Sequence, residues 1–129
     1  MFQNAITQDS FLQIRRYIHF VDNARMLPKD DPKWHALHKI KIAIDTILKT
    51  LAAGWILGQR ICVDESMIKY MGQFVSFIQY IPAKPIKHGI KVYALCCAYT
   101  GYLYMFEIYT GKGGTRDGSP KGVISRLLP

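Results

Sequence analysis

Two adjacent carboxylates, Asp64 and Glu65, are the side chains whose type and position best fit a chemical role in this sequence. They follow residues 61–63, an apolar and partly β-branched run that predicts a short buried strand. A strand that ends in Asp can hold a carboxylate rigidly where a divalent cation and a phosphate meet. The same pattern is also typical of a strand that simply turns into solvent. The pair alone therefore leaves both interpretations open.

A basic segment follows the two carboxylates. Residues 66–106 contain no Asp or Glu. Their basic side chains are Lys69, Lys84, Lys87, His88 and Lys91. The whole chain has 17 Lys and Arg against 9 Asp and Glu, a net charge of +8 at pH 7. Such an excess favours a polyanionic partner, either nucleic acid or an anionic membrane surface, although each of these lysines could equally be an ordinary surface residue.

The cysteines do not form a recognisable metal or disulfide motif. Cys96 and Cys97 are neighbours in a strand-like run, so their side chains point to opposite faces and are poorly placed to bond each other. No CxxC or Cys/His spacing indicates zinc. All three cysteines, the third being Cys62, lie in apolar runs. We therefore expect reduced, buried thiols, as in a cytosolic or nuclear protein.

Length and composition fit one folded domain. The chain has 129 residues, half of them hydrophobic, which excludes a disordered protein and allows a sizeable core. Residues 1–4 lack the basic and apolar regions of a signal peptide. The longest apolar runs are far too short to span a bilayer, so no membrane partner is expected.

Residues 1–58 are predicted to be helical and to precede the segment that carries chemistry. The first helix is expected to begin at capping residues 7–10 and to end near Phe20, with an apolar stripe at helical spacing. A polar loop over residues 22–33 separates it from a second helix. That helix is expected over residues 34–53, with a glycine after it as C-cap.

From residue 59 the hydrophobic period changes to that of strands. The elements expected after residues 61–63 are an extended or strand segment at 74–81, a hairpin of strands 90–98 and 102–109, and a helix beginning at 119–120. The last helix has Pro120 in its first turn, where proline is favoured. The order of elements predicts an α+β fold with antiparallel strands. Tyr80 and Tyr93 are expected to pack in it and not to stack on bases.

Six short motifs occur in order along the chain. They are Val63-Asp64-Glu65-Ser66-Met67, Tyr70-Met71-Gly72, Tyr80-Ile81-Pro82-Ala83-Lys84-Pro85, Lys87-His88-Gly89-Ile90-Lys91, Thr100-Gly101-Tyr102 and Tyr109-Thr110-Gly111. Together they resemble the piggyBac-type transposase family, and the likeness extends over essentially the whole chain. The Tyr-x-Pro-x-Lys-Pro and Gly-Ile-Lys elements are the specific ones.

The resemblance implies a helical lead-in at residues 1–58, followed at residues 59–129 by the first half of an RNase H-like domain. It implies a nuclear enzyme that cuts double-stranded DNA at transposon ends and joins it to TTAA targets, using Mg²⁺ or Mn²⁺. Asp64 falls on the position of the family's first catalytic, metal-binding Asp. Lys84, Lys87 and Lys91 lie in its basic block, where contact with the DNA backbone is expected. A homodimer is also compatible with the resemblance.

Some family features lie outside this sequence. By the resemblance, the second catalytic Asp follows the helix that begins at Ser119, and the third acid and a Cys-rich zinc domain come later still. Cys97 stands where relatives often carry Asp. Glu65 cannot substitute for the later acids, because adjacent strand residues point to opposite faces. We therefore expect an incomplete catalytic triad and no strand transfer by this chain alone.

Three functional hypotheses remain open from sequence. The first is a transposase fragment or transposon-derived protein, and the second is a non-catalytic DNA- or protein-binding module built from the same half-domain. The third is a basic α+β protein unrelated to transposition, which would require the six motifs to be coincidental. Half a sheet would leave a strand edge unpaired, so we also expect poor solubility or self-association.

Overall fold

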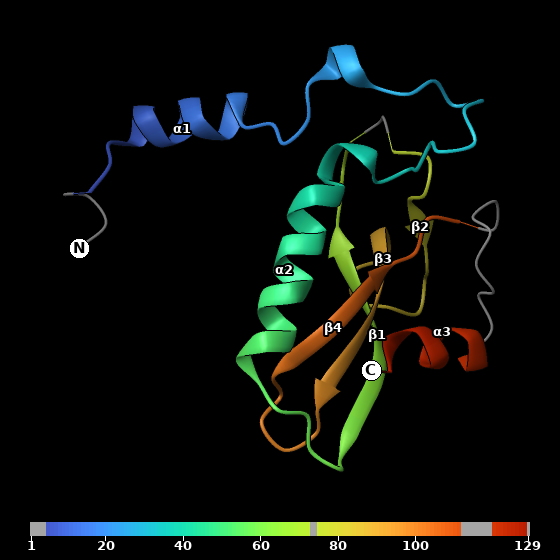
Figure 1. Ribbon diagram of the computed structural model, residues 1–129. Helices are drawn as coiled ribbons and strands as arrows, with labels where there is room; N and C mark the ends of the chain where they lie inside the picture. Colours follow the sequence, from blue (N-terminus) through green and yellow to red (C-terminus); the bar gives the residue numbers. More distant parts are fainter. Residues whose placement is uncertain (1–4, 73–74, 112–119, 129) are drawn as a thin grey trace. The chain divides into compact units, whose positions relative to one another are not determined.

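The computed structural model describes residues 5–72, 75–111 and 120–128. The chain forms two compact units, Met1–Ile44 and Asp45–Pro129 (Figure 1). The sequence-based division into domains at residues 58 and 59 stays a prediction. None of the described helices is long and apolar enough to cross a membrane.

The first unit contains the helix α1 (Gln8–Tyr17) and the 3₁₀ helices η2 (Asn23–Arg25) and η3 (His38–Ile40). The Thr7 hydroxyl caps α1 by accepting a hydrogen bond of 3.2 Å from the backbone N–H of Ser10. The expected start of this helix is confirmed. Its end is Tyr17, three residues before the predicted one, because Ile18 already has extended backbone angles.

The second long helix, α2 (Lys41–Gly54), begins later than the sequence indicated. The segment before it is held in turns by side chains that bond to the backbone. The Asp31 carboxylate accepts from the N–H of Lys33 at 2.7 Å, and the His35 ring nitrogen Nδ1 accepts from the N–H of Leu37 at 3.1 Å. These local bonds compete with helical hydrogen bonds, and the helical hydrophobic spacing does not reveal them.

The end of α2 is fixed by a close approach at Gly54. The Tyr102 hydroxyl donates a hydrogen bond of 3.0 Å to the carbonyl oxygen of Leu51, and the Tyr102 ring stacks on Trp55 at 5.3 Å between centroids. A Cβ at Gly54 would lie 2.7 Å from that hydroxyl. The helix therefore ends at the predicted glycine, but Gly54 is its last residue and does not adopt the left-handed conformation of a glycine C-cap. The close approach of Tyr102 is the steric reason for glycine here.

The second unit is built on an antiparallel sheet of four strands in the described residues (Figure 1). The strands are β1 (Ile61–Lys69), β2 (Gln79–Tyr80), β3 (His88–Cys97) and β4 (Leu103–Ile108). Strand β3 pairs with all three others, whereas β1 pairs only with β3 among the described strands. The α+β fold with antiparallel strands is confirmed.

Two strand predictions need correction. Strand β1 continues to Lys69, so Asp64 lies inside the strand and not at its end, and residues 61 and 62 are exposed. The predicted strand at 74–81 is reduced to Gln79–Tyr80, with residues 73 and 74 outside the described part. After it the chain turns, because the N–H of Lys84 bonds back to the carbonyl of Ile81 at 3.2 Å. Tyr80 is 66% exposed, contrary to the packing role expected for it.

The predicted hairpin joins β3 to β4. Its turn contains Gly101 with a φ of 72°, a left-handed conformation that glycine adopts without strain. The hydroxyl of Thr100 supports this turn by accepting from the N–H of Tyr102 at 3.2 Å. The register between β3 and β4 shifts by one residue between Leu95 and Cys96.

The helix α3 (Pro120–Leu127) covers one face of the sheet. Its Val123 and Leu127 are 3% and 1% exposed and pack against Tyr93 and Leu95 of β3 to form the core. The last helix and the buried Tyr93 were both predicted. Arg126 of α3 also forms an ion pair of 2.8 Å with Glu107 of β4.

Candidate functional site

Asp64 lies on the sheet face opposite the α3 core. Along β1, Val63, Glu65 and Met67 are the more buried positions, and Asp64 is exposed between them. This alternation follows from the pleat of the strand, which sends neighbouring side chains to opposite faces. We call the face that carries residues 62, 64, 66 and 68 the Asp64 face. The backbone N–H of Glu65 donates to the Asp64 carboxylate at 2.7 Å.

A hollow of about 560 Å³ opens on the Asp64 face. Its lining comes from β1, β3 and β4 and consists of Asp64, Glu65, Ser66, Ile68, Val92, Ala94, Cys96, Leu103 and Phe106. Directly opposite Asp64 in the register is Ala94, and opposite Ser66 is Val92. The surroundings of the carboxylate are thus largely apolar.

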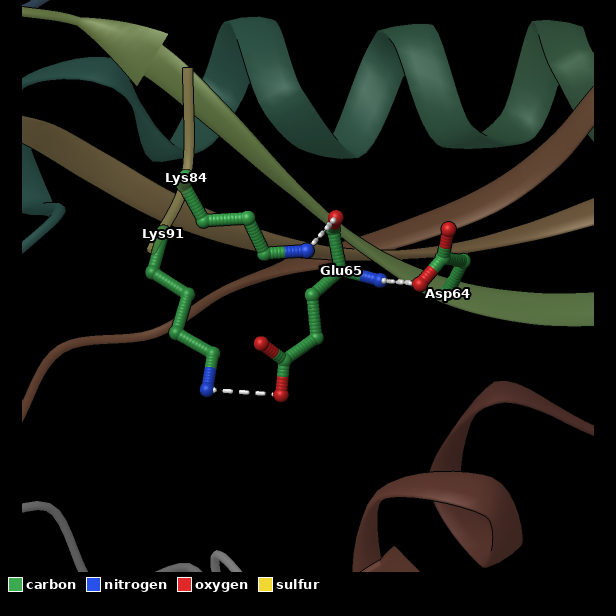
Figure 2. A network of polar contacts seen from close by, with 4 residues as sticks. All are labelled: Asp64, Glu65, Lys84 and Lys91. Carbon is green, nitrogen blue, oxygen red and sulfur yellow. Dashed lines mark hydrogen bonds and ion pairs between the residues drawn. The ribbon is translucent and has the colours of Figure 1, made fainter. Parts of the chain in front are cut away.

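Glu65 serves a different purpose from its neighbour, because its side chain leaves β1 in another direction (Figure 2). Its carboxylate forms an ion pair of 2.8 Å with the Lys91 ammonium. The ammonium lies 4.7 Å from the centre of the Tyr93 ring and 5.7 Å from that of Tyr109. Burial opposes the charged form, but hydrogen bonds to Glu65 and Tyr93 outweigh it and raise the pKa of Lys91.

The three lysines predicted to contact DNA do not form one cluster with Asp64. Lys91 is held by Glu65, and the Lys84 ammonium donates a hydrogen bond of 3.3 Å to the backbone carbonyl of Glu65 (Figure 2). Lys87 is exposed in the segment before β3. Their role in binding DNA stays a prediction, and of the three Lys87 is the most accessible.

The described residues do not supply a complete metal site. No group of three or more His, Cys, Asp or Glu that could hold a metal ion occurs among them. On the Asp64 face, Asp64 gives the hard carboxylate oxygens that Mg²⁺ or Mn²⁺ prefers, and Ser66 gives a hydroxyl. The described residues therefore fit one ligand of such an ion and not the whole site.

The cysteines differ from the sequence-based expectation in one respect. Cys97 is buried and Cys96 half-buried, as predicted, but Cys62 is exposed because it lies on the outward face of an edge strand. Burial raises the pKa of Cys96, and the charges of Cys62 and Asp64 act in the same direction. A hydrogen bond from Thr100 lowers the pKa of Cys97. No cysteine lies in a metal cluster of the described chain.

Sequence reasoning missed two pairings across the β1–β3 ladder. The first joins Glu65 to Lys91, and the second places Cys62 opposite Cys96. Matching the alternation of two strands could suggest both pairings, but only after the register between them is known.

Comparison with known proteins assigns the chain to a protein family. The family model described as Transposase IS4 matches residues 1–128. The chain therefore belongs to this family of transposases, which is the piggyBac-type family that its motifs indicated.

A solved structure agrees with the assignment. The chain is similar to a piggyBac transposase whose synaptic complex with hairpin DNA was determined by cryo-electron microscopy, with a TM-score of 0.79 and 25% identity. The match covers 95% of this chain and 25% of that chain, so the present chain spans about a quarter of the length of that transposase. The predicted fold class and family are thereby confirmed.

Proposed function

We propose that this chain is a part or a descendant of a piggyBac-type DNA transposase in which Asp64 is the first catalytic carboxylate. The observation that carries the proposal is the position of Asp64, exposed over a largely apolar hollow on a strand of the family's fold. The ancestral reaction is metal-dependent cleavage of DNA and strand transfer into TTAA sites, in an RNase H-like domain. Double-stranded DNA, a nuclear location and a homodimeric assembly belong to the same proposal.

Asp64 alone is insufficient for that chemistry. Cleavage of a phosphodiester by two divalent ions needs several convergent carboxylates to hold both ions. Glu65 does not help, because its carboxylate is engaged by Lys91. When bound, Mg²⁺ or Mn²⁺ would activate the attacking oxygen and stabilise the leaving one, and Asp64 would supply one ligand. We therefore propose that the 129-residue chain does not catalyse the reaction without acidic residues supplied from elsewhere.

The direct test incubates the purified chain with a transposon-end duplex and Mg²⁺ or Mn²⁺. No cleavage is expected. Cleavage that disappears in Asp64→Ala would overturn the proposed inactivity, yet it would support the catalytic role of Asp64.

A chimaera tests the role of Asp64 itself. Residues 1–128 replace the matching quarter of the similar piggyBac transposase, and excision of a transposon is measured. We expect Asp64→Asn to reduce excision at least a hundredfold, while Cys62→Ser, an exposed change on the same face but outside the lining of the hollow, leaves most of it. Equal activity of Asp64→Asn and the parent chimaera would exclude a catalytic role. A parent chimaera without excision would count against the family role of this segment.

The second candidate is a non-catalytic DNA-binding module, which is favoured by the net charge of +8 together with the single carboxylate on the Asp64 face among the described residues. Binding through phosphate contacts predicts an affinity that falls steeply with salt. Lys87→Ala should weaken binding to duplexes of any sequence, and Asp64→Asn should not. Affinity that is insensitive to salt would speak against this module.

A further inference from the structure

Cys62 and Cys96 form a pair of thiols outside the network around Glu65. The register places Cys62 of β1 directly opposite Cys96 of β3, and both thiols are free. Both residues belong to the Asp64 face, since Asp64 lies two residues after Cys62 on the same strand. Cys97 lies on the other face and is 5% exposed. The strand register therefore places Cys62 and Cys96 together on one face and Cys97 on the other.

The hydrogen-bonding pattern fixes the spacing of the pair. The N–H of Ala98 donates to the carbonyl of Arg60 at 3.0 Å, which makes residues 60 and 98 a hydrogen-bonded pair. Since such pairs alternate along an antiparallel ladder, residues 62 and 96 form one as well, with α-carbons about 5.5 Å apart. Disulfides usually join α-carbons about 4.4–6.8 Å apart. The backbone spacing thus suits a disulfide without a large rearrangement.

The side-chain spacing is slightly less favourable. Directly opposed β-carbons lie about 4.5–5.5 Å apart, and disulfides need about 3.5–4.5 Å. A small shift of one strand is therefore required. Strand β1 is free to make it, because β3 is its single partner among the described strands. A bond formed under such strain is readily reduced again, which is typical of reversible disulfides.

We propose that Cys62 and Cys96 are a reversible dithiol–disulfide site. The exposed Cys62 thiolate attacks one sulfur of a small disulfide such as oxidised glutathione, forming a mixed disulfide and releasing one glutathione. Cys96, half-buried beside it, then attacks the Cys62 sulfur and releases the second glutathione. The two protein thiols are oxidised, glutathione disulfide is reduced, and the two thiol protons end on the released glutathiones.

The consequence of this bond is local to the candidate site. It would join β1 covalently to β3 two residues before Asp64, on the face that carries the hollow. The sulfur of Cys96, which lines that hollow, would become part of the disulfide. The inference does not depend on the proposed transposition chemistry, because it rests only on the register and exposure of the two cysteines.

The experiment treats the purified full chain with oxidised glutathione and counts alkylatable thiols after denaturation. We expect the count to fall from three to one, with Cys97 as the thiol that remains. Peptide mapping should find Cys62 linked to Cys96 within one chain, and a mild dithiol reductant should restore all three thiols. A count that stays at three, or a bond that involves Cys97 or joins two chains, would overturn the proposal.

Single variants separate the two roles. Cys96→Ser should retain one glutathione on Cys62, because the resolving thiol is missing. The Cys62→Ser variant should bind little or no glutathione, since Cys96, the thiol left on this face, is half-buried. Cys97→Ser is the matched control and should form the bond as fast as the parent chain. Glutathione retained mainly on Cys96, or loss of the bond in Cys97→Ser, would contradict the assignment of roles.

Discussion

At the scale of residues, two adjacent carboxylates divide structural and functional duties. Glu65 points into the network of Lys91, Tyr93 and Tyr109, where it balances a half-buried ammonium. Asp64 points the other way, is exposed, and bonds to the backbone N–H of its neighbour. Removing Glu65 should therefore disturb the fold, whereas removing Asp64 should leave it intact and affect only function.

The Lys91 network predicts a pH dependence of stability. Because the pKa of Lys91 is raised above 10.5 in the folded chain, its stabilisation is fully present below about pH 10.5 and disappears as the pH rises through the folded value. Replacement by Lys91→Met should cost about 1 kcal/mol at pH 7, a modest figure because the Glu65 side chain is 40% exposed. The difference between parent and variant should shrink above pH 10.5.

Urea denaturation at pH 7, 9 and above 10.5 would measure this difference. Lys69→Met, an exposed change on β1, is the control and should show little effect at any pH. A Lys91→Met difference that grows with alkaline pH would contradict the assigned sign.

At the scale of elements, strand β1 carries Asp64 and pairs closely with β3. At Gly89 of β3 this pairing leaves no room for a side chain. A Cβ at Gly89 of β3 would overlap the carbonyl oxygen of Ile68 on β1. Gly58, in the segment before β1, would meet nothing within 4 Å. Glycine is therefore required for close strand pairing at position 89 but not at position 58, although both positions lie in the second unit.

Gly89→Ala should destabilise the chain by about 2–3 kcal/mol, because the backbone of β1 must move to admit the methyl group. Gly58→Ala should change stability by no more than about 0.5 kcal/mol. Denaturant midpoints measured on both variants check the contrast. Equal effects would show that β1 and β3 are not paired as closely as the register requires.

At the scale of the whole molecule, the edge position of β1 in the described sheet and the exposed apolar side chains of this strand favour association. Ile61 and Ile68 of this strand are 37% and 54% exposed. Among the strands that the structure describes, β1 is an edge strand of nine residues, and such an edge presents backbone groups that can bond to another chain. The expectation of self-association drawn from the sequence stays a prediction, and β1 is where we expect it to occur.

The mass of the chain in solution should therefore rise with concentration, as measured by light scattering after gel filtration. Ile68→Lys, which places a charge on β1, should lower the associated fraction severalfold. Ile56→Lys is the control, because Ile56 is 93% exposed but lies before the strand. A monomer at every concentration, with a sharp melt, would refute the prediction.

The sequence by itself determined the family and the order of elements, and it indicated Asp64 as the candidate catalytic carboxylate, which stays a prediction. Capping at Thr7, the glycine at the end of α2, the turn at Gly101 and the proline of α3 are local signals, so they can be read without knowing the fold. The start of α2 and the length of the strand expected at 74–81 were wrong, because local hydrogen bonds and turns overrode hydrophobic spacing there.

Only the tertiary structure decided which side chains meet. The register of β1 on β3 brings Glu65 diagonally within reach of Lys91, sets Cys62 opposite Cys96, and leaves Asp64 over a largely apolar hollow. Register depends on contacts between residues far apart in the chain, and a slip of one residue would move every side chain of β1 to the other face. The composition of the two strands therefore shows which reactive side chains are present, and the register between the strands decides which of these side chains lie side by side.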